Sequence, residues 1–144
     1  MAKQEGTGFS EFELAAMKER AAELRAEKGG KKKADNLASL HEKIEEMPDE
    51  EKTIALALHQ IVGEVAPDLA PRTWYGMPAY DKEGKVLLFL QGATKFETRY
   101  TTLGFNDTAA LDDGEMWATS FAIPALTDTV RERITDLVTR AVGK

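Results

Sequence analysis

The sequence predicts an α+β fold: a small, mainly antiparallel sheet of about four to five strands, packed against helices on one face. Apolar residues recur at helical spacing up to residue 66, and the pattern then changes to short apolar and β-branched runs separated by turn residues. A last helical pattern closes the chain. Because the strand-like runs follow one another directly, we expect them to pair as an antiparallel meander.

The first helix is expected to begin at Ser10, because Ser10 and Glu13 have the spacing of a capping box. An apolar stripe follows at helical spacing and requires a partner surface. The stripe consists of Leu14, Met17, Ala21 and Leu24. GGKKKAD at 29–35 predicts a flexible linker. We therefore divide the chain into an N-terminal amphipathic helix with its basic linker (1–33) and an α+β domain (34–144).

Two further helices are predicted on either side of Pro48, one over 35–47 and the next over 49–66. After Pro71, residues 72–80 predict a strand that is bent or lies at the sheet edge, because Pro78 cannot donate a ladder hydrogen bond. Further strands are expected at 85–92, 98–105 and 116–123, the last because its residues alternate cleanly. Thr127 is expected to cap a final helix.

Composition narrows the classes of function. The 144 residues include no cysteine, which excludes disulfides, thiolate metal sites and cysteine nucleophiles. Residues 1–33 carry eight Lys/Arg against six Asp/Glu, whereas 34–144 carry eleven against nineteen. This acidic body argues against nucleic acid as a partner. We find neither an apolar run of the roughly 20 residues that span a membrane nor a signal peptide, so a cytoplasmic protein is expected.

Motifs for enzymatic chemistry are absent from the sequence: it has no phosphate-cradling loop, dinucleotide fingerprint, zinc-protease helix or nucleophile elbow. The protein is therefore predicted not to be an enzyme. The densest candidate site is the acidic stretch HEKIEEMPDEE, whose oxygen ligands suit hard cations. The candidate metal ligands are Glu42, Glu45, Glu46, Asp49 and Glu50. The alternative is a solvated helix junction, with the later acids stabilising a helix N-terminus.

The second candidate site is the aromatic stretch TWYGMPAY, which could line a cleft or form a corner of the core. Its candidate ligand-binding residues, together with one from the last strand, are Trp74, Tyr75, Met77, Tyr80 and Trp117.

The same stretch resembles the YdhG-like family of small bacterial proteins. The resemblance spans about residues 35–142, and its most specific part is Trp74, Gly76, Pro78 and Tyr80 followed by the apolar strand Val86–Leu90. It implies a small antiparallel sheet packed with helices, likened to frataxin, and one branch of the family is described as an intracellular iron chaperone. By this resemblance, surface carboxylates would hold iron weakly as cargo and pass it to an iron-acceptor protein.

Three functions are therefore open: a non-enzymatic iron-binding protein, a protein-interaction module acting through the first helix, and a small-molecule-binding domain with an aromatic cleft. The oligomeric state is also open.

Overall fold

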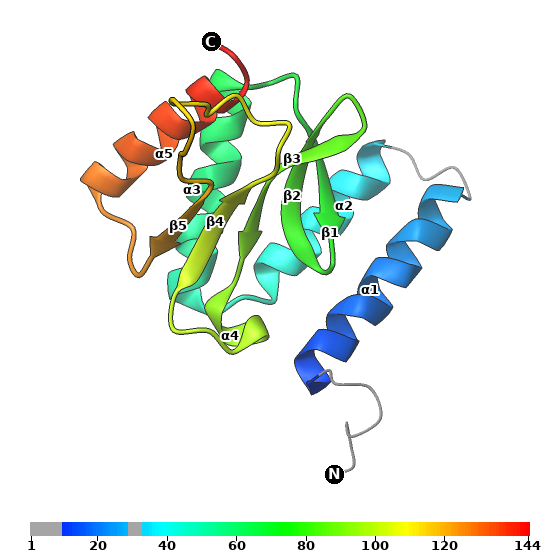
Figure 1. Cartoon of the computed structure of the whole chain (residues 1–144). Coiled ribbons are helices and arrows are strands. Elements are labelled where there is room, and N and C mark those ends of the chain that lie inside the picture. Colours follow the sequence, from blue (N-terminus) through cyan, green and yellow to red (C-terminus); the bar gives the residue numbers. More distant parts are fainter. Residues whose placement is uncertain (1–9, 29–32) are drawn as a thin grey trace.

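The computed structural model describes residues 10–28 and 33–144. It contains five helices and five strands within these residues (Figure 1). The helices are α1 (Glu11–Lys28), α2 (Lys33–Glu45), α3 (Asp49–Val65), α4 (Ala93–Phe96) and α5 (Asp128–Ala141). The strands are β1 (Ala70–Trp74), β2 (Met77–Lys82), β3 (Lys85–Gln91), β4 (Thr101–Phe105) and β5 (Ser120–Ile123). The predicted linker lies largely outside the described residues.

The five strands form one sheet in the order β1-β2-β3-β4-β5, and each pairs antiparallel with its neighbour. Helices α2, α3 and α5 cover one face, while α1 lies beside β1 and α4 (Figure 1). The predicted α+β meander with helices on one face is therefore confirmed.

The hydrophobic core lies between this sheet and the covering helices. The register places Tyr80, Leu88 and Phe105 in one row across the sheet, with Leu90 and Leu103 in the next. These rows pack against the buried faces of the helices, which are formed by Leu40, Ile44, Ile54, Leu58, Ile61, Ile134 and Val138. The apolar residues at helical spacing in α2, α3 and α5 therefore face mainly into the core, although Leu37 of α2 is 37% exposed.

The stretch TWYGMPAY corrects one prediction, because it forms two strands joined by a tight turn and not a single bent strand. Trp74 pairs with Met77, and the two residues between them, Tyr75 and Gly76, have φ values of 54° and 75°. Positive φ at both central positions is what a type I′ hairpin turn requires. Pro78 consequently lies in β2, which is flanked by β1 and β3, and not in an edge strand.

The last predicted strand is shorter than expected. Its regular pairing begins at Ser120, which lies opposite Gly104, and β4 ends one residue later at Phe105. The Phe105 amide still donates to the Thr119 carbonyl at 2.8 Å, but residues 116–118 have no strand left to pair with. Trp117 therefore lies in an irregular segment and not in the sheet.

Helix α1 begins as predicted but packs on an unexpected face. The Ser10 amide donates to Glu13 Oε1 at 2.9 Å, and the Glu13 amide donates to Ser10 Oγ at 3.3 Å, which completes the capping box. Of the predicted apolar stripe, however, Met17 and Leu24 are 44% and 42% exposed. The stripe therefore does not pack on the protein's own core, because charged side chains, described below, make the contact with the rest of the fold; a partner surface for the stripe stays a prediction.

Candidate ligand cavity

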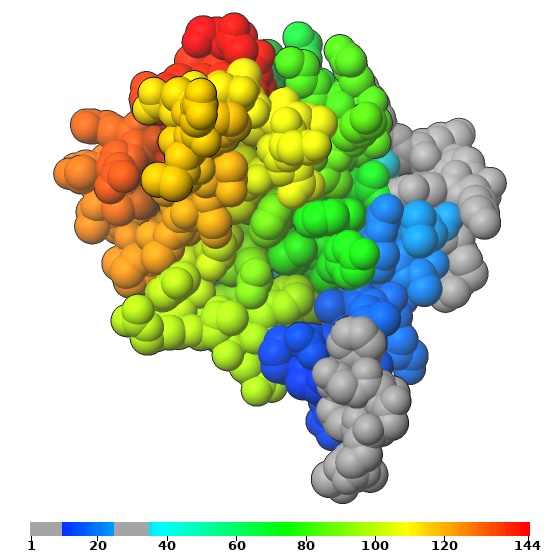
Figure 2. Space-filling view, viewed as in Figure 1, coloured from blue at the N-terminus to red at the C-terminus, as the bar shows by residue number. Residues whose placement is uncertain are grey.

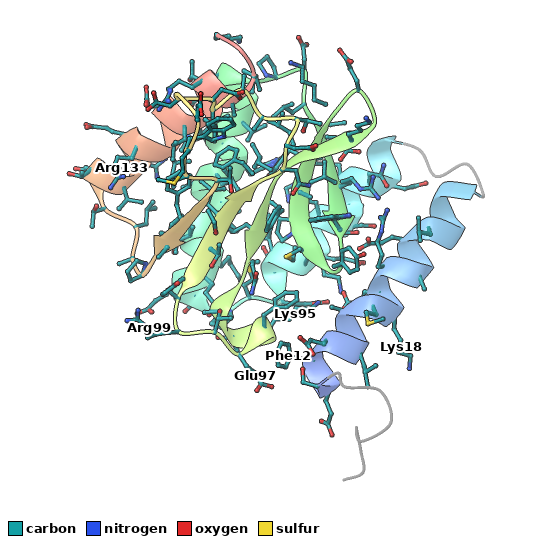
Figure 3. All side chains as sticks on the ribbon, in the orientation of Figure 1. Phe12, Lys18, Lys95, Glu97, Arg99 and Arg133 are labelled. Atoms are coloured by element: carbon teal, nitrogen blue, oxygen red, sulfur yellow. The ribbon has the colours of Figure 1, made fainter. Side chains whose placement is uncertain are left out.

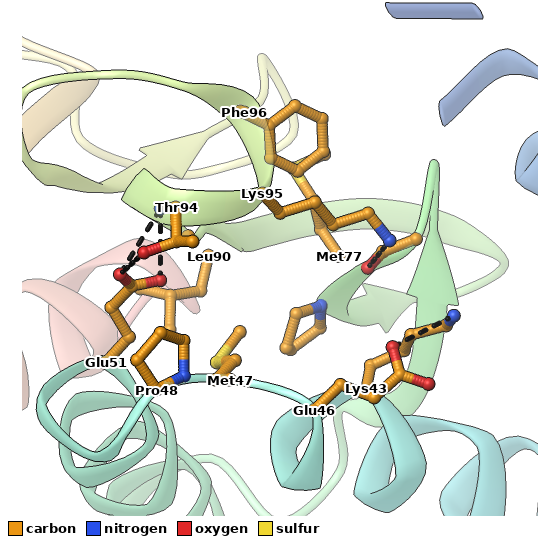
Figure 4. Close-up of a pocket in the computed structure, with 13 residues that line it drawn as sticks. Lys43, Glu46, Met47, Pro48, Glu51, Met77, Leu90, Thr94, Lys95 and Phe96 are labelled. Carbon is orange, nitrogen blue, oxygen red and sulfur yellow. Dashed lines mark hydrogen bonds and ion pairs between the residues drawn. The ribbon is translucent and has the colours of Figure 1, made fainter. Parts of the chain in front are cut away.

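A cavity of about 300 Å³ opens at the end of the sheet where the β1–β2 turn lies (Figure 4). Its walls come from the α2–α3 junction, the β1–β2 hairpin, the end of β3, and α4. The walls are mainly apolar, and their apolar side chains are Met47, Pro48, Met77, Pro78, Leu90 and Phe96. Polar groups lie at opposite sides of this lining. Small-molecule sites commonly combine an apolar wall with a few convergent polar groups in this way.

One polar side is formed by Glu51 and Thr94 (Figure 4). The Thr94 hydroxyl donates to Glu51 Oε2 at 2.6 Å, and the Thr94 amide donates to both carboxylate oxygens at 3.2 and 3.3 Å. A Cβ added at Gly92 would lie 2.9 Å from Glu51 Oε1. Glycine at this position therefore lets the carboxylate cap α4 and fix its place in the cavity wall.

The other polar side is formed by Lys43 of α2 and Lys95 of α4. Both ammonium groups contact the same carboxylate, that of Glu19 on α1: Lys95 Nζ lies 2.7 Å from Oε2 and Lys43 Nζ lies 3.1 Å from Oε1. Burial raises the pKa of Glu19, but the hydrogen bonds and charges of Lys95 and Lys43 outweigh it and hold that pKa below 4.5. Glu19 is therefore an ionised group shared by two lysines at the edge of the cavity.

A second carboxylate of α1 contacts the hairpin turn. Glu23, one helical turn after Glu19, accepts hydrogen bonds from the amides of Tyr75 and Gly76, each at 3.1 Å. The Arg20 guanidinium lies 5.8 Å from the centre of the Tyr75 ring. Figure 2 shows α1 lying against the hairpin and α4. The contact between α1 and the hairpin is therefore made chiefly by charged side chains and backbone amides.

An aromatic contact completes the docking of α1 near its first turn. The rings of Phe12 and Phe96 meet edge to face with centroids 6.5 Å apart. Figure 3 shows Phe12 and Lys95 on the facing sides of α1 and α4, and Lys18 pointing away from them. Ala16, one turn after Phe12, is the one side chain of α1 that is buried among residues 10–24. Little apolar area is therefore buried under this helix.

The predicted ligand-binding residues do not converge on one site. Met77 lines the cavity, whereas Trp74, which pairs with it across the hairpin, is half-buried with its ring 5.3 Å from that of Phe89. Tyr75 is in the hairpin turn and Tyr80 is in the core. Trp117 is 38% exposed and lines a different hollow of about 390 Å³ beside α5. Half of the residues lining that hollow are charged, so it suits an apolar ligand less well.

Tyr80 is 1% exposed, and its hydroxyl lies 2.9 Å from Nδ1 of His59. Burial raises the pKa of Tyr80, so its hydroxyl stays protonated and donates a hydrogen bond to Nδ1 in the His59 tautomer that carries its proton on Nε2. Partial burial and the nearby His41, whose ring centre is 5.1 Å away, lower the pKa of His59. The pair therefore consists of a neutral imidazole and a neutral phenol.

This arrangement predicts a loss of stability on mild acidification. In the unfolded chain His59 has a pKa near 6.5, whereas in the folded chain its pKa is lower. Stability should thus fall as the pH drops below about 6.5 and level off below the folded pKa. Urea unfolding at several pH values between about 7 and 5 should show a shallower decline for His59→Gln than for the wild type. Parallel declines in the two proteins would contradict this.

The acidic stretch lies at the exposed α2–α3 junction. Glu42, Glu45, Glu46, Asp49 and Glu50 are all exposed there, and two of them pair with lysines: Glu45 with Lys52 at 3.2 Å and Glu46 with Lys43 at 3.5 Å. Among the described residues, no group of three or more His, Asp or Glu side chains is placed to hold one metal ion. Glu46 also lines the cavity. Iron binding by this stretch stays a prediction.

No family model, curated protein or solved structure matches the chain. The YdhG-like resemblance therefore stays a prediction. Within residues 10–28 and 33–144, no helix is both long and apolar enough to span a membrane.

Sequence reasoning missed the residues that shape the polar edge of the cavity. Glu19, Glu23, Lys43 and Lys95 lie in charged segments where alternating signs are typical of a solvated helix surface. Gly76 was the available signal, because a Cβ there would collide with the Glu19 carboxylate. The positive φ of Gly76 in the turn already favours glycine, however, so this residue does not by itself reveal the approach of α1.

Proposed function

We propose that the protein is a non-enzymatic binding protein for a small molecule with an apolar body, held in the cavity between the hairpin, α4 and the α2–α3 junction. The observation that carries the proposal is the combination of about 300 Å³ of space with a mainly apolar wall drawn from four elements. Such walls exclude water and supply affinity through burial of apolar surface. Met47, Met77 and Leu90 provide the flexible and aliphatic part of this lining.

Octanol tests the proposal, because it has an apolar body and an uncharged head. We expect its titration into isotope-labelled protein to shift the backbone amide signals of the hairpin, α4 and the α2–α3 junction. Met47→Trp should fill part of the cavity and weaken binding by about tenfold or more, which corresponds to about 1.4 kcal/mol.

Met17→Trp is the matched control, because it makes the same change on the exposed side of α1. It should leave octanol affinity unchanged. Thermal unfolding of both variants would verify that they fold. Unchanged binding to Met47→Trp, or signal shifts scattered over the whole surface, would refute the cavity as the binding site.

A further inference from the structure

The fold without α1 presents a set of four donors that suits an anion. The ammonium groups of Lys43 and Lys95 and the backbone amides of Tyr75 and Gly76 all point to the side of the hairpin on which α1 lies. Backbone amides in a turn with successive positive φ values and nearby lysines are a recurring way to bind carboxylates and phosphates. In this structure the carboxylates of Glu19 and Glu23 occupy all four donors.

Two of these donors also belong to the cavity. Lys43 and Lys95 line its wall, and their ammonium groups meet at Glu19. A molecule lying in the cavity with an acidic group at its end could therefore reach the same two lysines. It would have to replace Glu19 there.

The attachment of α1 is weak enough to permit this replacement. The side chains of Glu19, Lys43 and Lys95 are 27%, 24% and 34% exposed, and ion pairs at such exposure contribute at most about 1 kcal/mol each. Met17 and Leu24 point away from the contact, so little apolar burial holds the helix in place. The helix is docked mainly by charged groups, together with the Phe12–Phe96 contact and the buried Ala16, and another anion can take the place of Glu19 at the two lysines.

We propose that the ligand of the cavity is an amphiphilic anion whose acidic group binds Lys43 and Lys95, and that Glu19 of α1 is a built-in competitor which this group displaces. The inference rests on the proposed function, since it requires that the cavity takes a ligand. The apolar wall binds the body of the molecule, and the two lysines bind its carboxylate or phosphate. Binding therefore releases Glu19 from Lys43 and Lys95 and loosens α1, whose remaining contacts are those of Glu23 with the hairpin and of Phe12 with Phe96.

Octanoate and octanol separate the two parts of this proposal, because they share a tail and differ in the charge of the head. Glu19→Gln removes the competing charge and preserves the size of the side chain. We expect it to bind octanoate about tenfold more tightly than the wild type and octanol equally well. Adding Lys95→Gln should abolish the gain. An unchanged octanoate affinity in Glu19→Gln, or a gain that survives Lys95→Gln, would overturn the inference.

Glu11→Gln is the matched control, because it removes a carboxylate from the exposed first turn of the same helix. It should leave both affinities unchanged. If octanol fails to bind the cavity, the proposed function fails. If octanol binds and Glu19→Gln gives octanoate no advantage, only the present inference fails.

The movement of α1 can be measured directly, because the chain has no native cysteine. Spin labels on Lys18→Cys and Asp113→Cys, both exposed positions, report the distance between α1 and the rest of the fold. Octanoate should broaden and lengthen the distance distribution, and octanol should not. A distribution that stays unchanged at saturating octanoate would show that Glu19 keeps its place, and the inference would be wrong.

Discussion

Replacing Tyr80 by alanine is expected to lower the free energy of unfolding by about 3–5 kcal/mol, the range for removing a large buried ring. The side chain is 1% exposed and lies in the row with Leu88 and Phe105 at the centre of the core. The surrounding helices and strands cannot all close around the space that the ring leaves. Urea unfolding monitored by circular dichroism would measure the change.

Two further variants separate the ring of Tyr80 from its hydroxyl and from a ligand-binding role. Tyr80→Phe retains the ring and should cost only about 1 kcal/mol, because His59 is partly exposed and can be solvated in its place. Trp117→Ala changes an aromatic residue that is 38% exposed and should have a much smaller effect than Tyr80→Ala. Nearly equal losses for Tyr80→Ala and Trp117→Ala would contradict the assignment of Tyr80 to the core.

Gly104→Ala is expected to destabilise the protein by about 1–3 kcal/mol, the usual cost of inserting a group into a packed site. Gly104 of β4 lies opposite Phe89 of β3, and a Cβ added there would overlap the Phe89 ring. Phe89 is held from its other side by Trp74, whose ring centre lies 5.3 Å away. The ring therefore has little freedom to move aside, and Trp74 fluorescence should report its displacement.

Gly63→Ala is the matched control, since no atom lies within 4 Å of a Cβ added at this position in α3. It should stabilise the helix by about 0.5–1 kcal/mol. Phe89→Leu should make room for the new methyl group. The loss of stability in the double variant Gly104→Ala/Phe89→Leu should therefore be smaller than the sum of the losses in the two single variants. Simple additivity would mean that the ring does not press on Gly104.

Some features of the fold can be predicted from local sequence patterns, and others cannot. The apolar periodicity of α2, α3 and α5 agrees with most of the residues that these helices bury, because burial of an apolar stripe is set by local spacing, but Leu37 of α2 is 37% exposed. The hairpin turn at Tyr75–Gly76 could not be predicted, because the sequence lacks the Asn-Gly or Asp-Gly pair that is typical of such turns. Tyrosine is an unusual residue at positive φ. The length of β5 was overestimated because pairing ends where its partner β4 ends.

The candidate site was harder to predict than the fold. Met77 and Glu46 were singled out from the sequence and both line the cavity, but they were assigned to two different sites. The two residues lie in one cavity because the α2–α3 junction packs beside the hairpin. No local sequence pattern predicts this packing. The role of Glu19 depends on contacts with Lys43 and Lys95, at sequence separations where charge patterns give no information.

The strand order of the sheet has a consequence for how the chain reaches its folded state. Each strand pairs with its neighbour in the chain, so β1, β2, β3 and β4 can assemble through successive local hairpins and a short connection containing α4. The entropic cost of loop closure is therefore small for most of the sheet. The exception is β5, which is separated from β4 by residues 106–119. Formation of the β4–β5 pairing, with α5 following it, is thus the step in sheet assembly that must close the longest loop.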